Sequence, residues 1–182
     1  FAATAAGAKA RATPMTLDDN TKIDLVVVGS TAVNPVNGAR VGKGEGFAEL
    51  EYGMMRQLGM IDENTPVVTT VLDDQVIEEG MPPKGKEMMV HDVPVDIIVT
   101  PTQVIRVPPS TRLPKPTGIY WNLLSKEKIA TIKVLRDLKE RIEKETGKEL
   151  ALAEQIEALP PLAKRAPNKR PNSAQTNRGR TK

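Results

Sequence analysis

Three short apolar runs separated by polar connections dominate the first hundred residues of the chain. They span 23–28, 66–72 and 96–100, and each is rich in β-branched side chains. Continuous runs of this kind are typical of strands that are covered on both faces, as in parallel sheets. A weaker run over 102–107 predicts a fourth strand at the edge of the sheet. The pattern therefore indicates an α/β protein with a mainly parallel sheet.

Two segments repeat their apolar side chains at helical spacing. The first, 47–60, predicts a helix whose C-cap is Gly59. The second begins at Ser125 and predicts one long helix that ends at Gly147. Its apolar stripe consists of Ile129, Ile132, Leu135, Leu138 and Ile142. A further short helix is expected over 150–159, before two consecutive prolines.

The composition divides the chain into four parts. Residues 1–20 form a basic N-terminal arm, and 21–124 hold the predicted α/β domain. A helical segment follows over 125–159, and 160–182 form a basic tail. Within the α/β part, the long connection 73–94 is of a length that is usually functional or poorly ordered.

A glycine-rich stretch at 40–49 is the strongest candidate for chemistry. It lies between the first predicted strand and the first predicted helix, and reads Arg-Val-Gly-Lys-Gly-Glu-Gly-Phe-Ala-Glu. In α/β proteins a loop in this position presents backbone N–H groups to a phosphate at the helix N-terminus. The order of elements therefore predicts a phosphate-binding loop.

Composition excludes several classes of protein and of site. The chain has no cysteine and one histidine, His91, so disulfides, thiolate chemistry and histidine-rich metal sites are ruled out. Five aromatic residues are too few for a platform that stacks single-stranded bases. No apolar run approaches the roughly 20 residues that a membrane-spanning helix needs. We therefore expect no membrane partner.

Charge is segregated along the chain. The tail carries seven basic residues and no acidic one: Lys164, Arg165, Lys169, Arg170, Arg178, Arg180 and Lys182. Residues 1–16 add Lys9 and Arg11, also without an acid, while 17–159 contain 17 basic and 23 acidic residues. Basic arms on an acidic body are typical of proteins that bind nucleic acid through their tails. The alternative is a solvated tail that aids solubility.

Five blocks in their order and spacing resemble the 5-formyltetrahydrofolate cyclo-ligase family, in its methenyltetrahydrofolate synthetase domain-containing branch. The blocks are IDLVVVGSTAV, RVGKGEGFAELEY, TPVVTTVLDDQV, HDVPVDIIVTPTQVI and KPTGIYW. The resemblance covers roughly residues 23–145. It implies a three-layer α/β/α fold, and ATP- and magnesium-dependent closure of 5-formyltetrahydrofolate to 5,10-methenyltetrahydrofolate. It also implies that the glycine loop holds ATP phosphates.

Carried over residue by residue, the family's loop pattern matches Arg40, Gly42, Gly44 and Gly46, with Phe47 as an aromatic in place of an aromatic. Lys43 adds a cation, but Glu45 brings a carboxylate towards like charge where the family has a glycine. Ala48 replaces a second aromatic. Glu49 replaces an aspartate and is the candidate metal ligand.

The family also begins with a segment that contacts ATP and forms the folate pocket, and nothing before Asp24 resembles it. The fold is therefore expected to be incomplete at its N-terminal side, and half a phosphate clamp is not expected to catalyse.

Two functions follow from these features. The favoured hypothesis is a degenerate cyclo-ligase-like domain that serves, without catalysis or cofactors, as an RNA-associated structural subunit of a ribonucleoprotein such as a mitochondrial ribosome. The resemblance supports it, because that branch can carry an RNA-recognition module. The alternative is a working cyclo-ligase that uses ATP and Mg²⁺ and whose N-terminal part is missing or supplied by another chain. A plainer third hypothesis is a small-molecule- or protein-binding domain.

The compartment expected from the acid-poor, arginine-containing start is mitochondrial or another organelle, and otherwise the cytoplasm. His91-Asp92 is expected to be an ordinary loop pair, with proton transfer as the alternative.

Overall fold

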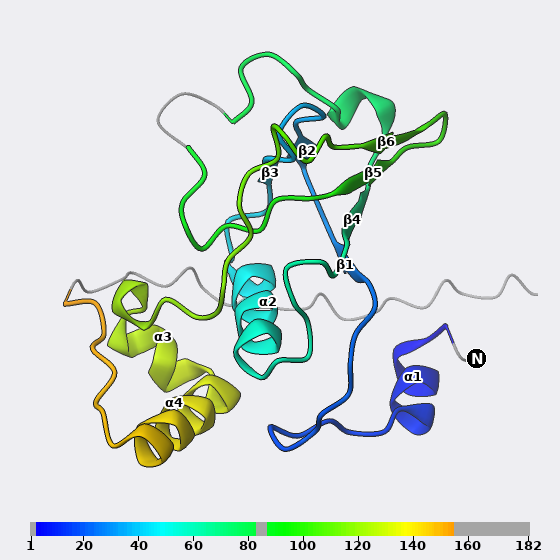
Figure 1. Ribbon diagram of the computed structural model, residues 1–182. Coiled ribbons are helices and arrows are strands. Elements are labelled where there is room, and N and C mark those ends of the chain that lie inside the picture. The colour runs from blue at the N-terminus through cyan, green and yellow to red at the C-terminus, as the bar shows by residue number, and fades with distance from the viewer. Residues whose placement is uncertain (1–2, 83–86, 155–182) are drawn as a thin grey trace, which may run out of the picture.

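A four-stranded sheet forms the centre of the computed structural model, which describes residues 3–82 and 87–154 (Figure 1). Its strands are β1 (Val26–Val28), β4 (Val67–Thr70), β5 (Ile97–Val99) and β6 (Val104–Arg106). They lie in the order β1-β4-β5-β6; β1, β4 and β5 are parallel, and β6 runs antiparallel to β5 at the edge. The α/β class, the mainly parallel sheet and the edge position of the last strand are therefore confirmed.

A small hairpin carries the chain from β1 to the glycine loop. It consists of β2 (Ala32–Val33) and β3 (Arg40–Val41), which pair antiparallel. The turn between them contains Gly38 at φ +74°, and a Cβ on this residue would lie 2.3 Å from the carbonyl oxygen of Val95. Only glycine fits both the left-handed backbone and this close approach. The turn therefore fixes the direction in which β3 presents Arg40.

Four α-helices accompany the sheet among the described residues: α1 (Ala5–Arg11), α2 (Phe47–Gln57), α3 (Lys126–Thr131) and α4 (Lys133–Thr146). Two short 3₁₀ turns occur at Asp73–Gln75 and Trp121–Leu123. Helix α2 begins where the sequence predicts and ends at Gln57; its C-cap is Leu58, directly before the left-handed Gly59. Helix α1 is not among the elements that the sequence pattern predicts.

The single long helix predicted from Ser125 to Gly147 is wrong in one respect, because the structure divides it into α3 and α4. The break falls at Ile132, whose backbone angles (φ −104°, ψ 98°) are not helical. Thr131 next to it donates its hydroxyl to the carbonyl of Glu127 at 2.9 Å, a bond that bends helices. The apolar stripe still faces inward on both pieces, and Gly147 ends α4 in the left-handed conformation (φ +67°).

The short helix predicted over 150–159 is absent from the part of it that is described, 150–154. Two backbone N–H groups there are bound elsewhere: that of Leu150 donates to the Glu143 carboxylate at 2.7 Å, and that of Ala153 to the Leu124 carbonyl at 2.9 Å. These contacts hold the segment against α4 and the start of α3, so it does not turn into a helix. Residues 155–159 lie outside the described residues, as do the basic tail 160–182 and its seven cations.

Two apolar clusters meet at α2. The first lies between one face of the sheet and α2, with Tyr52 at its centre. The second joins the other side of α2, through Leu50, to Leu135 and Leu138 of α4. Helices α2, α3 and α4 therefore lie on one side of the sheet (Figure 1). The opposite face remains largely exposed in the chain described here. Within the described residues, no helix has both the length and the apolar character needed to cross a membrane.

Tyr52 gives the core a measurable pH dependence. Its side chain is fully buried, its hydroxyl has no hydrogen-bond partner among the described residues, and burial raises its pKa to about 12. The unfolded chain therefore loses this proton near pH 10 while the folded chain keeps it, so stability falls as the pH rises from about 10 to 12.

We expect Tyr52→Phe to reduce this alkaline loss and to cost little at pH 7, because no hydrogen bond is broken. Urea unfolding at pH 7 to 11, followed by Trp121 fluorescence, measures both effects. Tyr120→Phe is the matched control, since Tyr120 is only partly buried, and it should leave the alkaline loss in place. An unchanged alkaline loss in Tyr52→Phe would contradict the assignment.

Candidate functional site

The glycine loop occupies residues 42–46, between β3 and α2. Gly44 and Gly46 have φ values of +78° and +69°, which side-chain-bearing residues rarely adopt. Gly46 is also the N-cap of α2, and no side chain caps the helix there. The backbone N–H groups of the first turn of α2 therefore remain open to an acceptor, as the sequence predicts.

A cavity of about 710 Å³ lies beside this loop. The residues that line it opposite the loop come from three places: Gly29–Thr31 after β1, His91 and Asp92 in the long connection, and Gly118–Tyr120 with Leu123, Leu124 and Lys128 around the start of α3. Its volume lies within the range of small-molecule sites. The structure thus brings together every loop residue that was predicted to bind phosphate or metal, and adds a second wall that the sequence did not link to the loop.

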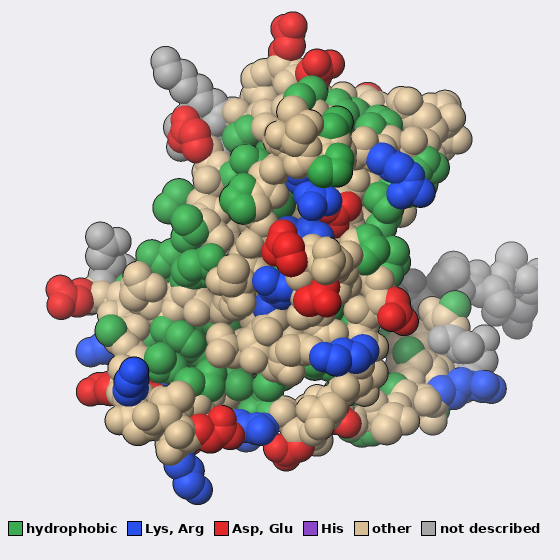
Figure 2. Space-filling model, viewed as in Figure 1, with side chains coloured by type: hydrophobic (Ala, Val, Ile, Leu, Met, Phe, Trp, Pro, Cys, Tyr) green, Lys and Arg blue, Asp and Glu red, His purple; other side chains and the backbone are tan. Residues whose placement is uncertain are grey.

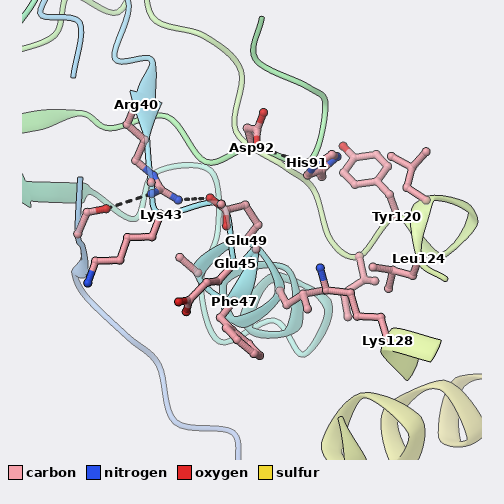
Figure 3. Close-up of a pocket in the computed structure, with 18 of the residues that line it drawn as sticks. Arg40, Lys43, Glu45, Phe47, Glu49, His91, Asp92, Tyr120, Leu124 and Lys128 are labelled. Carbon is pink, nitrogen blue, oxygen red and sulfur yellow. Dashed lines mark hydrogen bonds and ion pairs between the residues drawn. The ribbon is translucent and has the colours of Figure 1, made fainter. Parts of the chain in front are cut away.

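Arg40, the predicted phosphate ligand, is bound to the protein itself. Its side chain is 3% exposed. Its Nε donates to the Val93 carbonyl at 2.8 Å and one terminal nitrogen donates to the Gly29 carbonyl at 3.1 Å. The other terminal nitrogen forms an ion pair with the carboxylate of Glu49 (Figure 3). Each nitrogen of the guanidinium group therefore has a partner within the fold.

Glu49, the predicted metal ligand, is the other half of this ion pair. It lies in the first turn of α2, and its side chain is 18% exposed. Its charge is therefore neutralised by Arg40, and an ion at this position would compete with a buried guanidinium. Across the described ranges, no group of three or more histidine, cysteine, aspartate or glutamate residues could hold a metal ion. The described residues consequently do not fit a protein-held magnesium site.

Three further charged side chains line the cavity, two from the loop and one from α3. Lys43 and Glu45 make no ion pair with any described residue, and in Figure 3 their side chains point away from the Arg40–Glu49 pair. Lys128 approaches from α3, with its Nζ 3.0 Å from where a Cβ would stand on Gly46. The loop therefore offers one lysine and one glutamate of its own, and a second lysine lies over the start of α2.

His91 lies on the far wall of the cavity, close to Tyr120 (Figure 3). Its Nε2 is 3.8 Å from the Asp92 carboxylate, too long for a hydrogen bond. Its Nδ1 is buried without a hydrogen-bond partner among the described residues. No pattern in the sequence places His91 opposite the glycine loop, because the two are about fifty residues apart. Tyr120 lies in the KPTGIYW block, which was the one available signal for this wall.

Comparison with known protein families gives one match, which covers the first part of the chain. The sequence model of the 5-formyltetrahydrofolate cyclo-ligase family matches residues 2–101, which include β1 to β5 and the whole glycine loop. The chain belongs to this family. The match starts earlier than the motif resemblance, which begins at residue 23, and it ends before the wall around Tyr120.

Curated relatives extend the similarity through most of the chain. The mouse methenyltetrahydrofolate synthase domain-containing protein is 46% identical over 153 residues, which is 84% of this chain and 39% of the relative. The human protein of the same name is 44% identical over 158 residues, or 87% of this chain and 39% of the relative. The chain thus spans about two fifths of the length of these relatives. No solved structure matches it significantly.

Proposed function

We propose that this chain is a cyclo-ligase-like domain that has given up ATP chemistry and acts as an RNA-associated structural subunit of a ribonucleoprotein, such as a mitochondrial ribosome. The observation that carries the loss of chemistry is the Arg40–Glu49 ion pair. A cation whose side chain is 3% exposed, and each of whose three nitrogens has a partner within the fold, is poorly placed to bind the phosphates of a nucleotide. Phosphoryl transfer depends on positioned cations and a metal ion around those phosphates.

The charge of the loop supports the same conclusion. A nucleoside triphosphate without its metal carries several negative charges, and Glu45 adds another where the phosphates would lie. Lys43 offsets part of this charge, but Glu49, the residue that would hold Mg²⁺, is paired with Arg40. The proposed domain therefore keeps the shape of the ancestral site without its electrostatics.

RNA association rests on the sequence of the tail and of the N-terminal arm. The tail holds seven basic residues and no acid over 160–182. In the arm, Lys9 and Arg11 are exposed on α1. Such charge binds phosphates without reading sequence, and each contact releases counterions. A large complex of RNA and neighbouring proteins, in a mitochondrion or another organelle, is the setting that this charge pattern favours.

Salt-dependent RNA binding tests this proposal. Binding of a mixed-sequence single-stranded RNA is measured against salt for the full chain and for a chain that ends at Leu159. Truncation removes seven cations, so we expect the slope of log K against log salt to fall by about 5, at about 0.7 per contact. Replacing Lys9 and Arg11 by alanine is the matched control, with an expected change of about 1.4. Equal affinity and slope after truncation would refute the role of the tail.

The alternative function, an ATP- and Mg²⁺-dependent 5-formyltetrahydrofolate cyclo-ligase, keeps the support of one observation. The cavity of about 710 Å³ still adjoins the uncapped first turn of α2. A site of that size and position could bind a phosphorylated ligand even after the metal ligands are lost. Titration with ATP, combined with an assay for 5,10-methenyltetrahydrofolate, separates binding without turnover from binding with turnover.

A further inference from the structure

After α4 the chain returns to the start of α3. Beyond Gly147, where α4 ends, Leu150 and Leu152 pack against the second apolar cluster. The N–H group of Ala153 then donates to the carbonyl of Leu124 at 2.9 Å. Leu124 lines the glycine-loop cavity. The last described residues therefore bring the chain to the edge of this cavity.

The edge of the cavity offers exposed apolar side chains. Leu123, next to Leu124, is 43% exposed, and Phe47 on the side of the glycine loop is 41% exposed; both line the cavity. Hydrophobic side chains gather over α3 and the adjacent part of the long connection in Figure 2. Exposed apolar side chains that lie close together mark a surface that another group covers.

The sequence that follows the described part carries matching side chains. Residues 155–163 read Gln-Ile-Glu-Ala-Leu-Pro-Pro-Leu-Ala, and we call them the proline segment. Ile156, Leu159 and Leu162 recur at every third position, which is the period of a polyproline-type backbone. Such a backbone would place the three apolar side chains on one side of the segment.

Charge adds to this match. Helix α3 carries Lys126 and Lys128, and Figure 3 shows Lys128 reaching from α3 towards the start of α2. The proline segment and the residue before it carry Glu157 and Glu154, and no cation. Opposite charges on two segments favour their association and fix its register.

The chain is also long enough to cross the cavity. Leu159 lies six residues beyond Ala153 and Leu162 lies nine beyond it. Extended chain of these lengths spans up to about 20 Å and about 30 Å. The segment can therefore pass a cavity of about 710 Å³ before the first cation of the tail, Lys164.

We propose that the proline segment binds across the glycine-loop cavity of its own chain. Its apolar side chains face Leu123 and Phe47, and Glu157 faces Lys128. A short tether gives the segment an effective concentration in the millimolar range, so weak contacts are enough to hold it. The protein's own chain then occupies the cavity in place of a small molecule, and the basic tail begins at the cavity mouth. This inference goes beyond the proposed function, because it requires no RNA.

Disulfide cross-linking tests the inference, because the chain has no cysteine of its own. Phe47→Cys is combined with Leu159→Cys in the full-length protein, and disulfide formation in a glutathione buffer is followed by mass spectrometry. The bond requires Cα atoms within about 7 Å of each other. We expect it to form at least about tenfold faster than in the matched control, Val134→Cys with Leu159→Cys. Val134 lies on α4 and is 42% exposed, against 41% for Phe47.

A second measurement uses charge to release the segment. In Ile156→Asp combined with Leu159→Asp, we expect the amides of 43–50 to exchange hydrogen about tenfold faster than in the wild-type protein. Ala158→Asp adds a charge between these two positions, on another side of a polyproline-type backbone. It is the matched control and should leave the exchange unchanged.

Equal cross-linking rates at Phe47 and Val134, or unchanged exchange in the double aspartate variant, would overturn the proposal. Disulfide-linked dimers in place of cross-linked monomers would overturn it in favour of a second copy. Both measurements are made without RNA. If they fail while truncation of the tail still lowers the salt dependence of RNA binding, the proposed function stands and only the position of the proline segment is wrong.

Discussion

Arg40→Ala is expected to lower the free energy of unfolding by about 3–5 kcal/mol, because it leaves the Glu49 carboxylate charged and unpaired in a mostly buried position. It also removes the hydrogen bonds to the carbonyls of Gly29 and Val93, which tie the glycine loop to β1 and to the long connection. Urea unfolding of the variant and of the wild-type chain measures the loss. Replacing a phosphate-binding arginine at an open site would lower the free energy of unfolding far less.

The paired replacement separates charge from packing. Arg40→Met combined with Glu49→Leu removes both charges and keeps much of the volume, so it should recover most of the lost stability. Arg106→Ala is the matched single control, since this arginine is exposed and unpaired among the described residues, and we expect little change. If Arg40→Ala is as mild as Arg106→Ala, the ion pair does not hold the loop, and Arg40 is free to serve a ligand.

Asp96→Ala is also expected to lower the free energy of unfolding by about 3–5 kcal/mol. Its carboxylate pairs with Arg112 and with Lys115, whose side chain is 1% exposed, at 2.8 Å from the latter. It also accepts the backbone N–H of Val67 at 2.6 Å. Alanine would leave a buried ammonium with only the carbonyls of Glu63 and Thr65, and an N–H group of β4 without a partner.

Asp96→Asn should cost less than alanine, because the amide oxygen still accepts the Val67 N–H group. Asp137→Ala is the matched control, since its ion pair with Lys133 is exposed on α4 and should contribute little. Thermal and urea unfolding of the three variants give the order of their stabilities. If the alanine and asparagine variants both lose little stability, the contacts of Asp96 with its neighbours do not stabilise the fold.

The strands and the family loop are predictable because their causes are local. Valine-rich runs specify β1, β4 and β5 through the fit of β-branched side chains to a sheet, and Gly59 specifies the end of α2 through its left-handed backbone. The predicted runs are longer than the strands, because hydrogen-bonded pairing stops where the neighbouring strand ends, as it does before Leu72. Local propensity thus gives the elements more reliably than their bounds.

Other features depend on contacts between distant residues. The bond from Arg40 to the carbonyl of Val93 spans 53 residues, so no spacing in the sequence indicates that this arginine is closed off. No spacing in the sequence indicates the approach of Lys128 to Gly46 either. Lys128 belongs to the charged start of a helix, and only the fold places it in the cavity wall. No proline or glycine marks the break between α3 and α4 at Ile132 in the sequence. The chemical roles of these residues can therefore be assigned only from the fold, whereas the family can be recognised from the sequence alone.

The measurement that tests the loss of chemistry most directly is calorimetric titration of the full-length protein with ATP, in the presence of Mg²⁺ and 5-formyltetrahydrofolate, together with an assay for 5,10-methenyltetrahydrofolate. With Arg40 and Glu49 paired within the fold, we expect no saturable heat at millimolar ATP and no product. Saturable heat without product would show a nucleotide site that has lost only turnover. Saturable heat with product that Glu49→Gln abolishes would contradict the proposed function and establish the cyclo-ligase.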